Sequence, residues 1–212
     1  MGEYIFRGDH NYFWGLILME LDKKMVKFLC KTPITPNMVT LFNLFVNTVV
    51  CCLSACKKNY VITAVFIQIY MLLDCVDGDL ARNKRMTTEL GKKLDEFADF
   101  VFFTVFYLVL GWNMDISFWW AVALVVVQHI YGFTATYYIV PRIRKCGENF
   151  KRTRIKKFFY DKGILFGMDV TLQCLVTTLM LITPYREYLF LVNTVLWVVD
   201  LIYRLYEVQM QK

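Results

Sequence analysis

Long apolar blocks constrain this chain more than any other feature of its sequence. The block 39–56, VTLFNLFVNTVVCCLSAC, contains no charged residue. A nearly uncharged stretch of this length can cross the hydrocarbon core of a bilayer as a helix. Hydrophobic residues make up 58% of the chain and charged residues only 20%, less charge than a soluble domain of this size carries. The sequence therefore predicts one integral membrane domain over residues 1–212, without a separate soluble domain.

Six apolar segments are long enough to cross a membrane, since a crossing helix needs roughly 20 residues. They are 39–56, 60–82, 90–112, 116–140, 164–183 and 188–206. The links between them are short, apart from a segment at 141–163 that is rich in lysine and arginine. The predicted fold class is an all-α, polytopic membrane protein with six transmembrane helices.

Residues 11–31 follow a different pattern, in which apolar and charged residues take opposite faces of a helix. The apolar set is Trp14, Ile17, Leu18, Leu21, Met25, Phe28 and Leu29, and the charged set is Glu20, Lys23, Lys24, Lys27 and Lys31. This pattern is typical of a helix that lies in the membrane interface. An amphipathic helix packed on a soluble core is the alternative. The prolines of TPITPN (32–37) end the helix.

The segment 141–163 predicts the orientation of the chain. It contains nine lysines and arginines against two acidic residues, and cytoplasmic segments are enriched in lysine and arginine. With an even number of spans, both termini and the link 83–89 lie on this same cytoplasmic side. Lys57 and Lys58 on the other side argue against this orientation, but they are few. In a bacterium, the membrane would be the cell membrane.

Four aspartates interrupt the apolar pattern at the end of the second segment and the start of the third. A carboxylate at the centre of a membrane helix costs about 2.5–3.5 kcal/mol, so four of them need a reason. Asp74 and Asp77 share one helix face, and Asp95 and Asp99 share another. The two helices are joined by a short link, so we expect antiparallel neighbours whose four carboxylates converge.

Converging carboxylates favour a hard divalent cation, because Mg²⁺, Mn²⁺ and Ca²⁺ prefer oxygen ligands. Two such ions about 3.5–4 Å apart form the arrangement that assists phosphoryl displacement. Gly78, Ala81 and Gly91 on the same faces leave room for a ligand, and Arg82 offers a planar fork to a phosphate. Acid–arginine pairs and small-residue packing between membrane helices are the structural alternative.

The pattern Asp74-x2-Asp77-Gly78-x2-Ala81-Arg82-x8-Gly91-x3-Asp95-x3-Asp99 resembles the signature of the CDP-alcohol phosphatidyltransferase family, and every fixed position matches. The resemblance implies transfer of a substituted phosphate group from a CDP-alcohol to an acceptor alcohol with release of CMP, in phospholipid synthesis. It also implies that two Mg²⁺ or Mn²⁺ ions serve as the cofactor and that the protein forms a homodimer in contact with membrane lipid.

The resemblance also implies roles for individual residues. Asp74, Asp77, Asp95 and Asp99 would hold the metal ions, and Asp99 would be the catalytic base for the acceptor hydroxyl. Nucleotide-binding positions would be Asn37, Thr40, Asp74, Gly78, Ala81, Arg82 and Gly91. Arg82 could instead brace the helices, and Asn37 could simply be the N-cap of the first span.

The donor and acceptor stay open at this point. Either CDP-diacylglycerol gives its phosphatidyl group to a small polar alcohol, or a soluble CDP-alcohol such as CDP-choline or CDP-ethanolamine gives its headgroup to diacylglycerol. The basic segment suits anionic partners and favours the first version. The segment also suits lipid headgroups, and because it lies against the membrane we expect no binding of nucleic acid.

Several polar residues outside the signature are weaker candidates. Arg142 and Arg144 follow the fourth span and are candidates for contact with a phosphate of the acceptor. Asp169 could contact the acceptor or pair with a lysine of the basic segment. Asp200 and Arg204 lie one turn apart and are expected to pair with each other. His129 is expected to be a packed residue with one hydrogen bond.

Two other functions use acidic residues in membranes. An intramembrane prenyltransferase would need two separate aspartate-rich motifs on non-adjacent helices, whereas here all four lie on one helix pair. A divalent-cation transporter would need acidic residues along a path near the middle of the membrane, whereas these lie near one side. Both are therefore more distant alternatives.

Overall fold

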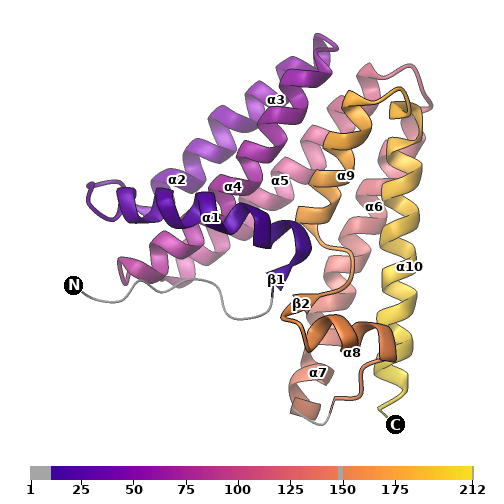
Figure 1. Ribbon diagram of the computed structural model, residues 1–212. Helices are drawn as coiled ribbons and strands as arrows, with labels where there is room; N and C mark the ends of the chain where they lie inside the picture. The colour runs from indigo at the N-terminus through magenta and orange to yellow at the C-terminus, as the bar shows by residue number, and fades with distance from the viewer. Residues whose placement is uncertain (1–10, 148–149, 212) are drawn as a thin grey trace.

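The computed structural model describes residues 11–147 and 150–211, most of which are helical (Figure 1). The helices are α1 (Phe13–Leu29), α2 (Pro36–Phe42), α3 (Thr48–Cys56), α4 (Tyr60–Asn83), α5 (Glu89–Asn113), α6 (Phe118–Thr134), α7 (Val140–Cys146), α8 (Arg154–Tyr160), α9 (Val170–Ile182) and α10 (Leu189–Gln209). Two π-helical turns, Asn43–Asn47 and Ala135–Ile139, join α2 to α3 and α6 to α7 without a break, and a 3₁₀ turn spans Arg186–Tyr188.

Four helices are long and apolar enough to cross a membrane: Pro36–Cys56, Tyr60–Asn83, Phe118–Cys146 and Arg186–Gln209. They match the first, second, fourth and sixth predicted spans, although the fourth helix continues past residue 140. The third and fifth predicted spans correspond to α5, which is charged in its first half, and to α9, which has only 13 residues. The integral membrane class is supported, and the count of six stays a prediction.

The fifth predicted span, 164–183, is wrong at its start. Ile164–Leu165 form a short strand β2, and the helix begins only at Val170. Gly163 has a positive φ of 76°, a conformation that favours glycine, and it turns the chain before the strand. The Asp169 side chain then caps the helix by accepting a hydrogen bond from the Leu172 backbone N–H at 2.9 Å.

The basic segment 141–163 was expected to be a loop between two spans. The structure instead contains two short helices in it. Arg142 and Arg144 lie on α7, which prolongs the fourth membrane helix, and α8 forms a separate short helix. The π-helical turn before α7 keeps the helix continuous across Pro141, whose N–H is missing from the ladder of hydrogen bonds. Much of the positive charge is therefore carried on helices.

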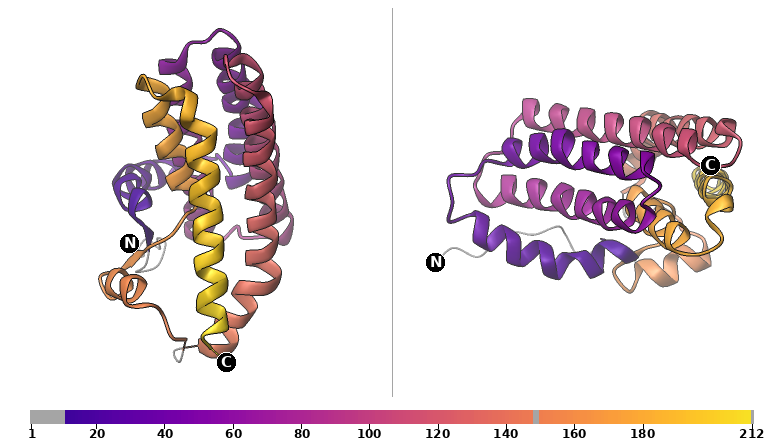
Figure 2. Two further views of the ribbon diagram at one scale, coloured as in Figure 1. Left: turned by 90° about the vertical axis from the view of Figure 1, so that its right-hand side faces the viewer. Right: turned by 90° about the horizontal axis from the view of Figure 1, so that it is seen from above.

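The helix formed by α2, the π-helical turn Asn43–Asn47 and α3 packs against both α4 and α5, and in the view from above it lies between them (Figure 2). Two asparagines of the turn fix this arrangement. Asn43 donates a hydrogen bond to the carbonyl oxygen of Tyr70 at 3.0 Å, and Asn47 donates to that of Phe66 at 3.1 Å. Side-chain amides commonly join membrane helices in this way.

Helix α1 lies across the bundle instead of along it, and it packs on α4 (Figures 1 and 2). Val26 is fully buried there, while Leu21 and Phe28 are exposed at 51% and 68%. The predicted apolar face is thus divided between the protein and the surroundings. The side chains of Trp14 and Ile17 lie outside the described residues. The position of this helix in the membrane interface stays a prediction.

A two-residue parallel strand pair is the exception to the all-α class. Strand β1 (Asn11–Tyr12) runs beside β2, with Asn11 opposite Ile164 and Tyr12 opposite Leu165. The start of α1 is thereby tied to the segment that connects α8 to α9.

The centre of the bundle is packed with aromatic side chains. The largest fully buried ones are Tyr70, Phe102, Phe106, Tyr107 and Phe190. The Tyr70 and Phe102 rings stack at 3.5 Å between centroids and connect α4 to α5. Deletion of one such ring typically costs about 3–5 kcal/mol. This core holds the polar ends of α4 and α5 in place.

Candidate active site

A cavity of about 500 Å³ opens between α2, the end of α4 and the start of α5. Its lining includes eight residues that the sequence pattern had singled out: Asn37, Thr40, Asp77, Gly78, Ala81, Arg82, Gly91 and Asp95. Three separate stretches of the chain therefore contribute to one space, although the signature itself covers only α4 and α5. The structure brings these predicted residues together.

Helix α2 contributes a hydroxyl group to the carboxylate cluster. Thr40 donates a hydrogen bond from Oγ1 to Oδ2 of Asp77 at 2.6 Å, and both side chains are buried. Thr35, one turn earlier, is the N-cap of α2, so the alternative of Asn37 as the cap is wrong. The Asn37 side chain instead lines the cavity.

Gly91 lies at a close approach between α2 and α5. A Cβ atom built on Gly91 would lie 3.0 Å from Oδ1 of Asn37 and 3.1 Å from Oγ1 of Thr88. The Thr88 hydroxyl accepts a hydrogen bond from the Gly91 backbone N–H at 3.0 Å and so caps α5. A larger residue at position 91 would therefore require the Asn37 and Thr88 side chains to shift by a few tenths of an ångström.

Arg82 both lines the cavity and braces α4. Its guanidinium group pairs with Asp79 one turn back, and a Cβ atom on Gly78 would lie 3.7 Å from the same group. Asp79 is buried, with 1% exposure, and sequence reasoning missed it because it occupies a variable position of the signature. A guanidinium group held by a buried carboxylate is fixed in direction, which suits recognition of a phosphate.

Asp99 lies deeper along α5, where Tyr70 donates a hydrogen bond from its hydroxyl to Oδ1 of Asp99 at 3.1 Å. The charges of Asp74, Asp95 and Asp77 all act on the Asp99 carboxyl group. Asp99 therefore lies within electrostatic reach of the other three aspartates, and their convergence on one metal site stays a prediction. Sequence reasoning missed Tyr70, because a tyrosine in an apolar span carries no distinctive signal.

The expected close packing of α4 against α5 is wrong in one respect. Their backbones approach each other at few points, and long side chains such as Tyr70 and Phe102 bridge them. The helix Pro36–Cys56 occupies the space that the expected direct contact would have used. The separation leaves room for the cavity at the ends that carry the aspartates.

The donor set suits a hard divalent cation, because coupled carboxylates, a hydroxyl group and an amide all offer oxygen. Within residues 11–147 and 150–211, however, no three His, Cys, Asp or Glu side chains stand together as a ready-made metal site. The assignment of Asp74, Asp77, Asp95 and Asp99 as metal ligands therefore stays a prediction, supported by the chemistry of these groups.

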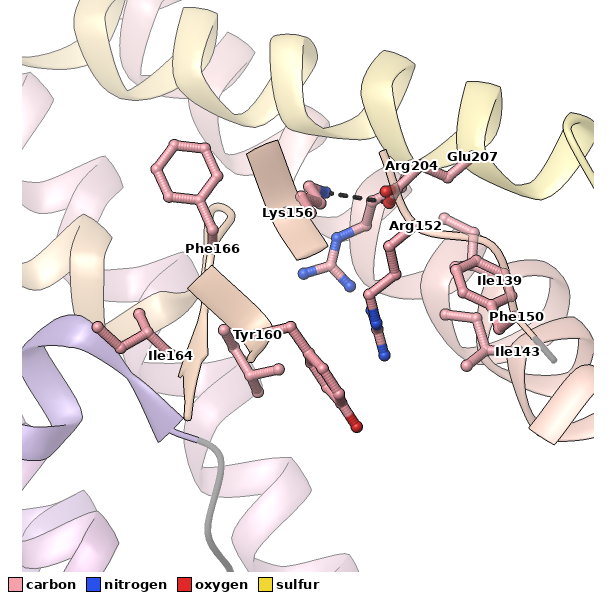
Figure 3. A pocket seen from close by; sticks show the side chains of 11 residues that line it. Ile139, Ile143, Phe150, Arg152, Lys156, Tyr160, Ile164, Phe166, Arg204 and Glu207 are labelled. Carbon is pink, nitrogen blue, oxygen red and sulfur yellow. Dashed lines mark ion pairs between the residues drawn. The ribbon is translucent and has the colours of Figure 1, made fainter. Parts of the chain in front are cut away.

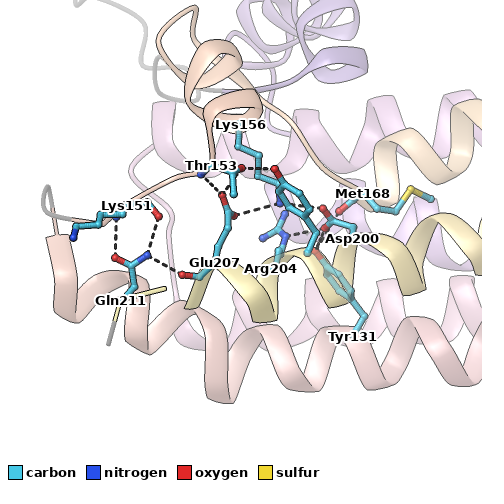
Figure 4. Close-up of polar contacts among 10 residues, drawn as sticks. Tyr131, Lys151, Thr153, Lys156, Met168, Asp200, Arg204, Glu207 and Gln211 are labelled. Atoms are coloured by element: carbon cyan, nitrogen blue, oxygen red, sulfur yellow. Dashed lines mark hydrogen bonds and ion pairs between the residues drawn. The ribbon is translucent and has the colours of Figure 1, made fainter. Parts of the chain in front are cut away.

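A second polar cluster lies apart from this cavity, between α6, α8 and α10 (Figure 4). The predicted pair is confirmed, since Arg204 contacts Asp200 at 2.8 Å. Lys156 also contacts Asp200, at 3.1 Å, and Tyr131 donates a hydrogen bond to Asp200 at 2.6 Å. Lys156 further contacts Glu207 at 3.6 Å. The charges in this cluster largely neutralise one another.

The weaker candidates have mixed outcomes. Asp169 hydrogen-bonds Thr171 and Leu172 as a helix cap, and the lysine of the basic segment, Lys156, pairs with Asp200 instead. Arg142 donates to the carbonyl oxygen of Tyr138 on its own helix, and neither Arg142 nor Arg144 lines the cavity near the aspartates.

His129 is a packed residue, as expected. It hydrogen-bonds Thr104 at 2.9 Å and contacts the Phe100 ring, which leaves it with a structural role between α5 and α6.

A smaller cavity of about 160 Å³ beside the second cluster was not foreseen (Figure 3). Arg152, Lys156 and Arg204 line it together with aromatic and aliphatic side chains. Arg152 stacks over the Tyr160 ring with 4.0 Å from its Cζ to the ring centroid. The abundance of basic residues in 141–163 pointed to this region, but not to the residues that meet there.

Comparisons with known proteins agree with the geometry. A search of curated proteins gave no match. Two crystal structures of phosphatidylinositol phosphate synthase from Mycobacterium tuberculosis share the fold. The one with CDP-DAG bound has 15% identity, a TM-score of 0.62, and coverage of 89% of this chain and 94% of the other. The complex with manganese and citrate has 14% identity, a TM-score of 0.61, and coverage of 89% and 88%.

The family comparison covers most of the membrane domain. A model of the CDP-alcohol phosphatidyltransferase family matches residues 33–200, which include all four aspartates and all three stretches that line the cavity. Such proteins transfer substituted phosphate groups. The chain is a member of the CDP-alcohol phosphatidyltransferase family.

Proposed function

We propose that this chain transfers a phosphatidyl group from CDP-diacylglycerol to the hydroxyl group of an acceptor alcohol and releases CMP. The observation that carries the proposal is the cavity between α2, α4 and α5, because it gathers eight residues of the proposed nucleotide and metal site. A similar fold with CDP-DAG bound supports a lipid-linked donor. The acceptor class is left to experiment.

The cavity residues divide into two roles. Asn37, Gly78, Ala81 and Gly91 bind and admit the cytidine nucleotide, because their small or amide side chains shape the wall. Arg82, fixed by Asp79, binds a phosphate of the donor. Together they hold the pyrophosphate next to the aspartates.

The aspartates hold the cation and move a proton. Asp74, Asp77 and Asp95 bind Mg²⁺ or Mn²⁺, with Asp99 completing the site for two ions. The bound cations neutralise charge on the pyrophosphate and on the departing CMP. Thr40 orients Asp77, and Tyr70 orients Asp99 through its hydrogen bond. Asp99 takes the proton of the acceptor hydroxyl when that group attacks the phosphorus atom.

Substrate identity can be tested directly. The purified protein is incubated with Mg²⁺ and either CDP-diacylglycerol plus polar alcohols or CDP-choline plus diacylglycerol, and CMP release and lipid products are measured by mass spectrometry. The proposal expects CMP and a new phosphatidyl lipid only with CDP-diacylglycerol, and no product in EDTA. Product from CDP-choline and diacylglycerol would replace this donor with a soluble one. CMP formation in metal-free buffer would contradict the metal site.

We further propose six membrane crossings, with the aspartates on the cytoplasmic side, and a homodimer. Helix α5, with 25 residues, is about 37 Å long and exceeds the hydrocarbon core. Helix α9, with 13 residues, is about 20 Å long and completes its crossing with the extended residues before it. The exposed Leu21 and Phe28 on α1 face the headgroup region.

Two native cysteines offer a test of this orientation. Exposed Cys56 ends α3 next to Lys57, and Cys146 ends α7 at the opposite end of the bundle. In variants whose only cysteine is Cys56 or Cys146, a membrane-impermeant maleimide should label Cys56 in intact cells and Cys146 only after permeabilisation. Labelling of Cys146 from outside would invert the topology. Crosslinking of the protein in membranes tests the homodimer.

A further inference from the structure

A large apolar cavity lies next to the small basic one. It has a volume of about 620 Å³ between α8, the start of α9 and α10. Most of its wall is hydrocarbon or aromatic, as shown by Ile155, Phe159, Leu172, Leu196 and Val199. The cavity is open to the surroundings, since Ile155, Phe166 and Val199 in its wall are each at least half exposed, so an apolar chain can enter it. The cavity is therefore a candidate ligand site.

The apolar and basic cavities adjoin each other at β2, and together they are called the combined space. They share Lys156, Ile164, Leu165 and Phe166 in their walls. Neither shares a lining residue with the cavity near the aspartates. The combined space is apolar at one end and basic at the other, and it is separate from the proposed nucleotide site.

The basic end carries an excess of positive charge. In the wall of the small cavity, three cations, Arg152, Lys156 and Arg204, stand against one carboxylate, Glu207, whereas Asp169 and Asp200 line the adjoining apolar cavity. Lys156 and Arg204 are engaged with Asp200, whereas Arg152 makes cation–π contacts with Tyr160 and Phe150. Arg152 is half-buried and keeps a guanidinium edge available, which is a geometry that recognises phosphate. An anionic group fits this end by charge.

We propose that the combined space binds a phosphate-bearing membrane lipid other than the CDP-linked donor, with its headgroup at Arg152 and one hydrocarbon chain in the apolar cavity. Burial of the hydrocarbon chain against the apolar wall favours binding by about 25 cal/mol per Å² of apolar surface removed from water. The headgroup supplies the negative charge that the basic end lacks. An uncharged amphiphile with a hydrocarbon chain would fill the apolar cavity but would bring no negative charge to the basic end.

Photo-crosslinking tests this site in the full-length protein. The probe is phosphatidic acid with a diazirine on one acyl chain, in phosphatidylcholine vesicles, and crosslinked peptides are mapped by mass spectrometry. The site predicts labelling of α8, the start of α9 and the Leu196 region of α10. Unlabelled phosphatidic acid should compete, and diacylglycerol with the same chains should not. Labelling spread evenly over the lipid-facing helices would overturn the proposal.

Matched variants separate the two ends of the site. Leu196→Trp fills the apolar cavity and should remove labelling there, whereas Leu191→Trp on the exposed face of α10 should not. Arg152→Gln should weaken competition by phosphatidic acid about tenfold, the value of one lost charge-assisted hydrogen bond. Arg154→Gln, exposed and outside both cavities, should have no effect. Equal labelling in all four variants would contradict the site.

The source of the bound chain is also distinguishable. Asp77→Asn in the aspartate cluster should leave the labelling intact, because the lipid is not the nucleotide-linked donor. If Asp77→Asn abolishes the labelling and CDP-diacylglycerol competes for it, the cavity holds the donor chain and the proposal is wrong. CMP release is measured in parallel, so failure of the proposed reaction can be told from failure of this site.

Discussion

The two charged regions of the molecule differ in what their carboxylates face. Near the nucleotide cavity, Asp77 and Asp99 accept hydrogen bonds from the hydroxyl groups of Thr40 and Tyr70, and the other three aspartates act electrostatically on Asp99. In the cluster between α6, α8 and α10, Asp200 faces two cations. In the proposed metal site a bound cation would relieve the mutual repulsion of the first region, whereas Asp200 in the second region already has cationic partners within the protein. Asp200 is therefore expected to contribute to stability, and the aspartates of the first region to ligand binding.

The largest effect is expected at the aspartates of the first region. Asp77→Asn removes a charge that the metal ion needs and should abolish CMP release, as should Asp74→Asn or Asp95→Asn. Glu96→Gln is the matched control, because Glu96 is an exposed acid directly beside Asp95 on α5. Its CMP release should equal that of the unmodified chain. A comparable loss in both variants would remove the distinction between the two regions.

Asp99→Asn should lower turnover by about 10²–10⁴, the usual contribution of a positioned acid–base group. Asparagine retains the size and an oxygen ligand but cannot take the acceptor proton. Calorimetric binding of a cytidine nucleotide should change little. If binding and turnover fall together, Asp99 is primarily a metal ligand, and the base lies elsewhere.

Asp200→Asn should affect stability and leave nucleotide binding unchanged. It leaves Lys156 and Arg204 partly uncompensated in a buried setting, and loss of one partner of a buried ion pair costs about 3–5 kcal/mol. Thermal unfolding in detergent measures the effect. Asp115→Asn is the control, since Asp115 pairs with Lys58 on the exposed surface and its loss should have little effect. Equal melting temperatures for the two variants would contradict the stabilising role.

The smallest effect is expected at Gly91. Gly91→Ala adds a methyl group 3.0 Å from Oδ1 of Asn37, so the wall of the nucleotide cavity must shift by a few tenths of an ångström. The KM for the CDP-alcohol should rise several-fold while kcat changes less. Gly132→Ala, in α6, meets no atom within 4 Å and serves as the control. An unchanged KM in Gly91→Ala would mean that the nucleotide does not use this wall.

The two regions also differ in how far the sequence could predict them. The aspartates lie on two helices that follow each other directly, so the helical period alone places them on two faces. Asn37 and Thr40 were suggested only by the resemblance, because nothing local shows that α2 lies between α4 and α5. The cluster around Asp200 depends on Lys156 and Tyr131, which are distant in sequence, and only the Arg204 contact was within reach of spacing rules.

The fifth predicted span, 164–183, shows why the start of α9 was missed. Hydropathy over 164–183 is continuous, so the pattern favoured a helix throughout. The backbone responds to local chemistry instead: Gly163 turns the chain, and the Asp169 side chain satisfies backbone N–H groups at the true start of α9. A glycine and an aspartate within an apolar block were the available signals.

The pairing of β1 with β2 sets an order for biosynthesis. Asn11–Tyr12 leaves the ribosome well before its partner Ile164–Leu165, which emerges only after three of the four candidate membrane helices have been made. Until then the amino-terminal segment has no strand to join, and α1 can rest only on α4. The pairing of β1 in the first third of the chain with β2 in the last third thus forms late, together with the walls of the basic and apolar cavities. The pairing of β1 with β2 therefore forms only after these helices have been synthesised.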